Sequence, residues 1–143
     1  MIWNKEMECA DRETMRALQL KKLKETVKYE YDNVPYYREK MDKAGVKPED
    51  IQTLEDIRKL PFITKEDIAA NYPTGLFAKP MEEIVRIHAS SGTTGKPKIA
   101  GYTRNDLALW GECVARAMAS AGQDSKSVIQ VAYGYGLFTG GLG

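Results

Sequence analysis

The sequence predicts an α/β protein whose N-terminal region is helical and whose C-terminal part begins a sheet domain with an incomplete sheet. Apolar side chains recur at helical spacing through residues 11–32, and short β-branched segments appear only after Pro80. Two of these segments flank a loop rich in glycine, threonine and lysine. We therefore divide the 143 residues into a mainly helical region, 1–80, and the start of an α/β domain, 81–143.

A long helix is predicted over residues 11–32, because Asp11 is a favourable N-cap and apolar residues follow at intervals of three and four. These residues are Leu20, Leu23, Val27 and Tyr31. Proline is favourable at the first position of a helix, so Pro35 is expected to open a second helix. Gly45 is placed to end that helix.

Two short helices are predicted next, each after a threonine that is followed three positions later by an aspartate. The pairs are Thr53 with Asp56 and Thr64 with Asp67, and Pro61 separates them. In this arrangement the threonine side chain and the acidic side chain each accept a hydrogen bond from the other residue's backbone N–H. Both helices are therefore expected to begin with a variant of the capping box.

The pattern beyond Pro80 alternates between strand and helix signals. Strands are expected over 83–89 and 99–102, on either side of the loop. Thr103 with Asp106 then caps a helix that Gly122 ends. The apolar run 127–132 is expected to form a short strand of the fully buried type.

Composition excludes several classes of protein. The net charge of +1 provides no basic surface for nucleic acid or anionic membranes, and no apolar run is long enough to span a bilayer. The start of the chain lacks the apolar segment of a signal peptide, so a cytoplasmic location is expected. Cys9 and Cys113 lie far apart in sequence and His88 is the only histidine, so no metal-ligand cluster is expected.

The loop at residues 90–98 reads SSGTTGKPK and carries most of the functional information. Glycines let backbone N–H groups approach an anion closely, hydroxyls donate to phosphate oxygens, and lysines supply positive charge. The loop is not a Walker A motif, because Ser90 stands where that motif needs glycine and Pro97 follows Lys96 in place of a serine or threonine. On composition alone, an ordinary exposed turn explains the same residues equally well.

Four segments together resemble the phenylacetate–CoA ligase branch of the adenylate-forming superfamily, which includes acyl-CoA synthetases and luciferases. They are HASSGTTGKP at 88–97, GYT at 101–103, LEDIRKLPFITKED at 54–67 and YGYGLFTGG at 133–141. The resemblance covers nearly the whole chain. Family members are several times longer, so it implies an N-terminal fragment that contains the start of the large adenylation domain.

The resemblance also implies roles for two groups of residues. ATP phosphates would be held by Ser90, Ser91, Gly92, Thr93, Thr94, Gly95 and Lys96. The cavity for the acyl substrate would be lined by Tyr133 and Phe138, whereas Tyr135 would face either this cavity or the nucleotide. For any single one of these aromatic residues, ordinary core packing is the competing interpretation.

The activity implied is AMP-forming ligation of phenylacetate, or of an indoleacetate-like or benzoate-like acid, to coenzyme A with ATP and Mg²⁺. The catalytic lysine, the magnesium-binding acid and the adenine contacts of the family lie beyond this chain, so the fragment alone is expected to be inactive. Self-association, as a homodimer or otherwise, is implied only by resemblance. Two alternatives remain open: a non-catalytic nucleotide- or phosphate-binding module, and an oligomerisation segment. His88 is interpreted as structural, with a catalytic base as the alternative.

Overall fold

The computed structural model describes residues 1–90 and 97–132, and these form two compact units. One unit is continuous, from Asp11 to Pro80, and is built of helices. The other combines residues 1–10 with the described residues from Met81 onward, and it contains a two-stranded sheet and a long helix. The predicted order, helices followed by strands and a helix, is therefore observed.

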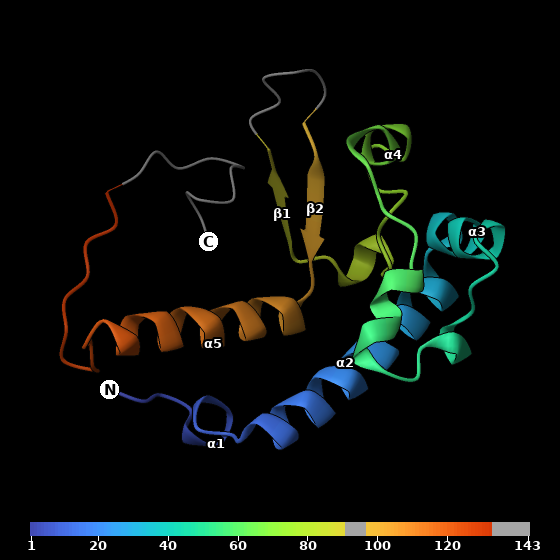
Figure 1. The fold of residues 1–143 in the computed structure, drawn as a ribbon. Helices are drawn as coiled ribbons and strands as arrows, with labels where there is room; N and C mark the ends of the chain where they lie inside the picture. Colours follow the sequence, from blue (N-terminus) through green and yellow to red (C-terminus); the bar gives the residue numbers. More distant parts are fainter. Residues whose placement is uncertain (91–96, 133–143) are drawn as a thin grey trace. The chain divides into compact units, whose positions relative to one another are not determined.

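The helical unit contains three α-helices and two short 3-10 helices: α2 (Arg12–Asn33), α3 (Pro35–Lys43), η1 (Pro48–Asp50), η2 (Leu54–Lys59) and α4 (Lys65–Ala70). The caps that we predicted form: Asp11 accepts a hydrogen bond from the backbone N of Thr14 at 2.7 Å. Pro35 is the first residue of α3, and Gly45 follows that helix with φ +66°, a value that favours glycine. In Figure 1, α2 is the long blue helix beside η2 and α3.

The core of this unit forms where α2 meets α3 and the segment that follows α3. Val27, Met41, Val46 and Ile51 are buried together, and Ile51 is fully inaccessible. Leu23, Tyr31 and Leu60 pack against them. The helical spacing that we recognised in the sequence therefore marks the face of α2 that is buried.

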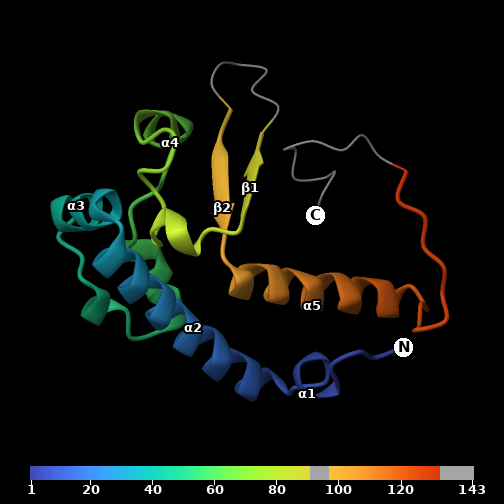
Figure 2. The ribbon, with the colours of Figure 1, turned by 180° about the vertical axis from the view of Figure 1, so that it is seen from behind.

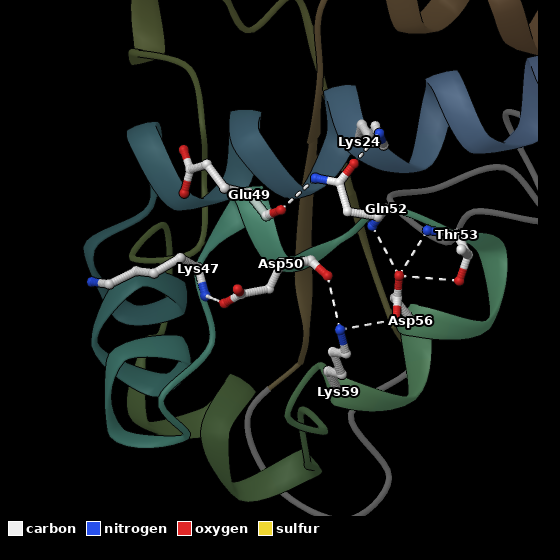
Figure 3. Close-up of polar contacts among 8 residues, drawn as sticks. All are labelled: Lys24, Lys47, Glu49, Asp50, Gln52, Thr53, Asp56 and Lys59. Atoms are coloured by element: carbon white, nitrogen blue, oxygen red, sulfur yellow. Dashed lines mark hydrogen bonds and ion pairs between the residues drawn. The ribbon is translucent and has the colours of Figure 1, made fainter.

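The turn that leads into η2 is held by polar contacts around Asp56 (Figure 3). Its carboxylate accepts hydrogen bonds from the backbone N of Thr53 at 2.7 Å and of Gln52 at 2.9 Å, and it pairs with Lys59 at 2.9 Å. These contacts, the Lys59 pair first, lower the pKa of Asp56 below its usual range. Lys59 also donates to the backbone carbonyl of Asp50 at 3.0 Å, which joins η2 to η1.

The second unit contains α1 (Lys5–Glu8), η3 (Met81–Glu83), β1 (Arg86–Ala89), β2 (Ile99–Tyr102) and α5 (Arg104–Ser120). The strands are antiparallel, with Arg86 opposite Tyr102 and Ala89 opposite Ile99. They lie side by side in Figures 1 and 2, where α5 leads away from the end of β2. The capping box at Thr103 forms as predicted, since Asp106 accepts from the backbone N of Thr103 at 2.8 Å.

Two strand predictions need correction. The first strand begins at Arg86 and not at residue 83, because residues 81–83 form η3. The strand predicted over 127–132 is wrong: this segment has no strand structure, and Val128 is 97% exposed. A strand needs a neighbouring backbone to complete its hydrogen bonds, and no described segment provides one here.

Replacing Ile51 by alanine should destabilise the helical unit, because it leaves a cavity at a fully buried position. We expect the free energy of unfolding to fall by about 2–5 kcal/mol in urea denaturation followed by circular dichroism. Ile57→Ala is the matched control, since Ile57 is 54% exposed, and should change that free energy by about 0.5 kcal/mol or less. Equal losses for the two variants would contradict the assigned core.

The carboxylate of Asp67 should make the stability of the helical unit depend on pH. Its carboxylate contacts the Lys40 ammonium and accepts from the Tyr36 hydroxyl at 2.5 Å. These two partners, Lys40 first, hold the pKa of Asp67 well below its usual range. A lowered pKa in the folded state stabilises the fold above the unfolded-state value of about 4, and that contribution is lost as the pH falls.

Asp67→Asn should therefore lower the urea midpoint at neutral pH and make the loss of stability below about pH 5 shallower. The measurement is the urea midpoint as a function of pH. Glu39→Gln is the control, because Glu39 is 62% exposed in its pair with Lys43, and exposed pairs contribute little. An unchanged acid profile in the Asp67 variant would contradict the role of this carboxylate.

Candidate functional site

The two strands hold the ends of the predicted phosphate loop. The last pair of the ladder is Ala89 with Ile99, and two hydrogen bonds join the next residues, Ser90 and Lys98. The backbone N of Ser90 donates to the carbonyl of Lys98 at 3.0 Å, and the backbone N of Lys98 donates to Oγ of Ser90 at 2.9 Å. We call this doubly bonded pair, Ser90 and Lys98, the neck of the loop, because it holds the two ends of the loop together. The strand–loop–strand setting predicted from Pro97 is therefore observed.

Ser90 is the one predicted phosphate-binding residue that the structure describes. It is exposed, and its oxygen accepts the hydrogen bond from Lys98. A hydroxyl has one donor and two acceptor positions, so the O–H of Ser90 remains able to donate to an anion. The other predicted phosphate ligands, Ser91, Gly92, Thr93, Thr94, Gly95 and Lys96, lie outside the described residues.

Three aromatic rings, one each on β1, β2 and α5, pack against one another. His88 on β1 lies 5.2 Å from Tyr102 on β2 and 5.4 Å from Trp110 on α5, measured between ring centroids. Tyr102 and Trp110 are 5.2 Å apart, and the His88 and Tyr102 rings meet edge to face at 75°. This aromatic cluster joins both strands to the helix, and edge-to-face contacts of this kind add to the energy of burial.

His88 is fully buried in the aromatic cluster, and neither of its ring nitrogens has a hydrogen-bond partner among the described residues. The packing agrees with the structural interpretation of this histidine. The lack of a partner was not foreseen, because the sequence does not reveal that rings 14 and 22 positions away surround the imidazole. Buried polar atoms without partners are uncommon in proteins.

A carboxylate on α5 secures the first residues of the chain. Glu112 accepts from the indole nitrogen of Trp3 at 2.8 Å and from the side-chain amide of Asn4 at 3.0 Å. Asn4, then Trp3 and Arg116, lower the pKa of Glu112. Asn4 also caps α1, where its side chain accepts from the backbone N of Met7 at 3.1 Å. The sequence contained this capping signal, but we did not recognise it.

The predicted acyl-substrate residues, Tyr133, Tyr135 and Phe138, lie outside the described residues. Within the described part of the same unit, an open groove of about 510 Å³ runs along β2 and α5. Its lining includes Tyr102, Leu109, Trp110 and Cys113. Cys9 and Cys113 are both free thiols.

Over the ranges 1–90 and 97–132 there is no group of three or more His, Cys, Asp or Glu side chains able to hold a metal ion. None of the helices in those ranges is long and apolar enough to cross a bilayer.

Ser90→Ala should loosen the neck of the loop, because the backbone N–H of Lys98 then loses its acceptor. We expect amide hydrogen exchange at Lys98 to become about tenfold faster, the equivalent of one hydrogen bond. Ser120→Ala is the control, since Ser120 donates to the carbonyl of Ala117 within α5, away from the loop. Unchanged exchange at Lys98 would show that the serine side chain does not close the neck.

Comparison with known proteins supports the resemblance carried by the motifs. No protein-family model matches the chain. The chain is 56% identical over 137 residues to a phenylacetate-coenzyme A ligase of Escherichia coli strain K12, which is 96% of this chain and 31% of that protein. It is 52% identical over 143 residues to a ligase of the same name from Thermus thermophilus, covering 100% of this chain and 32% of that protein.

Solved structures agree with the sequence comparison. A 2-hydroxyisobutyryl-CoA ligase in the postadenylation state, in complex with R3-HIB-AMP, matches 85% of this chain with a TM-score of 0.76 and 27% identity, over 26% of its own length. The same ligase in complex with 2-HIB-AMP and CoA matches 76% of this chain with a TM-score of 0.69 and 30% identity, over 24% of its length. This chain is thus a relative of the phenylacetate-coenzyme A ligases and spans about a third of the length of the curated relatives it matches.

Proposed function

We propose that this chain is part of an ATP-dependent, AMP-forming ligase that joins phenylacetate or a similar aryl acid to coenzyme A. The observation that carries the proposal is 50–56% identity to four phenylacetate-coenzyme A ligases over at least 96% of the chain. The loop neck at Ser90 and Lys98 adds support, because it presents an exposed hydroxyl at the start of a segment rich in phosphate-binding residues.

The proposed reaction has two steps. The substrate carboxylate attacks the α-phosphate of ATP, which forms an acyl-adenylate and releases pyrophosphate. The thiol of coenzyme A then attacks the acyl carbon, and AMP leaves as the thioester forms. In the first step negative charge must be held and oriented, which fixed hydrogen-bond donors do without reorganisation.

The loop from Ser90 to Lys96 is assigned to the β- and γ-phosphates of ATP. Two serines and two threonines offer hydroxyl donors, two glycines allow a close approach of backbone N–H groups, and Lys96 contributes charge. Tyr133 and Phe138, with Tyr135 on either the acyl or the nucleotide side, are assigned to the acid. Residues 81–143 belong to the adenylation domain in this proposal, and residues 1–80 precede it.

Mg²⁺ is expected to accompany ATP, as in most polyphosphate chemistry. The part of the chain that the structure describes provides no carboxylate cluster for it. In our proposal the magnesium ligands, the adenine contacts and the catalytic lysine come from the portion of the ligase that this chain does not cover. We also propose that the ligase is located in the cytoplasm and that it associates with further copies of itself.

The test is a double variant of the complete ligase, Thr93→Ala with Thr94→Ala. Loss of two donors to the phosphates should raise the KM for ATP at least about tenfold, while the thermal midpoint stays within a few degrees of the parent value. Pyrophosphate release in the presence of ATP and phenylacetate is the measurement. The 143-residue chain alone should release none.

The matched control is Thr14→Ala with Thr26→Ala, which removes two exposed hydroxyls from α2 and should leave the kinetics unchanged. Unaltered adenylation in the loop variant would refute the role of the loop. Turnover by the isolated chain would show that the proposed catalytic groups outside it are not needed.

A further inference from the structure

The groove along β2 and α5 is an apolar surface to which the proposed function assigns no occupant. Its lining comes from the end of the strand and from the first half of the helix: Gly101, Tyr102, Asp106, Leu109, Trp110 and Cys113. Leu109 is 63% exposed, and the thiol of Cys113 is free and exposed as well. Among these six residues only Asp106 is charged. The groove therefore suits an apolar occupant, and it lacks the basic residues that would attract nucleic acid or an anionic membrane.

Helix α5 carries little charge on the side that borders this groove. Its charged residues are Arg104, Asp106, Glu112 and Arg116. Glu112 pairs with Arg116 at 3.1 Å and also accepts hydrogen bonds from the first residues of the chain, so these two charges already have partners. Leu109, Cys113 and Ala117 recur at intervals of four, which puts them in a row on the helix, and all three are exposed. A helix that is apolar on more than one side is normally buried.

The hairpin is too small to cover α5. The helix has 17 residues and is therefore about 26 Å long. β1 and β2 have four residues each, so the hairpin measures about 13 Å along its strands and about 5 Å between them. In Figures 1 and 2 the helix leads away from the end of β2. Much of the apolar surface of α5 is thus left open by the described residues, and the groove is the part of it next to β2.

We propose that this groove is a docking site for an apolar segment from the rest of the ligase, which packs against Leu109 and Trp110 and covers the thiol of Cys113. The relatives point to this occupant, because the chain covers only 31% of the Escherichia coli ligase and 26% of the solved ligase that it matches with a TM-score of 0.76. A segment of the same polypeptide acts at an effective concentration on the order of millimolar, which favours it over a second copy from dilute solution. The inference rests on the proposed function, because it takes the occupant from the ligase.

The two cysteines provide a direct test, since Cys113 lies in the groove and Cys9 does not. N-ethylmaleimide is applied to the 143-residue chain and to the complete ligase, and the labelled peptides are followed over time by mass spectrometry. Each rate is divided by the rate of the same thiol in urea. In the chain alone both thiols should react readily, because both are exposed. In the complete ligase Cys113 should react at least about tenfold more slowly, because a covered thiol is inaccessible to the reagent.

A variant checks that the groove is filled and not only narrowed. Cys113→Glu keeps a residue that favours helix but places a charge in the groove. It should leave the urea midpoint of the 143-residue chain unchanged, because the position is exposed there. It should lower the midpoint of the complete ligase clearly, because an unpaired charge would then be buried. Asn105→Glu is the matched control, since Asn105 is an exposed residue of α5 outside the groove lining, and it should change neither midpoint.

The outcomes separate this inference from the proposed function. If Cys113 reacts equally fast in both proteins and Cys113→Glu is harmless in both, the docking site is refuted, whereas pyrophosphate release by the same ligase would leave the proposed function standing. If Cys113 of the 143-residue chain becomes protected as its concentration rises, a second copy fills the groove and the inference is also refuted. If Cys113 is covered in a complete protein that activates no aryl acid, the docking site stands and the proposed function fails.

Discussion

The contact among His88, Tyr102 and Trp110 is the interaction on which the arrangement of the candidate site depends. A two-stranded hairpin is marginal by itself in water, because it has one hydrogen-bonded ladder and little apolar surface to bury. Here the aromatic cluster packs the hairpin against α5 and supplies that surface. The two strands that lead to Ser90 and Lys98 are therefore held in place by packing against α5.

Local signals predicted most of the helical structure because the interactions that start and end a helix are local in sequence. Thr64 and Thr103 form their capping boxes with residues three positions away, so a short window of sequence contains the whole interaction. The run 127–132 failed as a strand prediction for the opposite reason. Its apolar composition is typical of a buried strand, but a strand depends on a partner that composition cannot specify.

The sequence indicated the loop at residues 90–98, but it did not indicate the aromatic cluster of His88, Tyr102 and Trp110 beside it. The loop was recognised from residue types whose chemistry is independent of the fold, and the exclusion of a Walker A motif needed only Ser90 and Pro97. The aromatic cluster was not predictable, because the burial of His88 depends on contact with Trp110, which lies on another element. Local motifs thus suggested a chemistry for the loop, and only the tertiary structure revealed the aromatic residues that pack beside it.

The contact between Trp3 and Glu112 has a consequence for the order in which the chain can fold. It joins residues 109 positions apart, whereas the unit from Asp11 to Pro80 is continuous. During synthesis from the ribosome the continuous unit has all its partners early, and it can complete its core while α5 is still untranslated. The first ten residues must wait until Glu112 emerges.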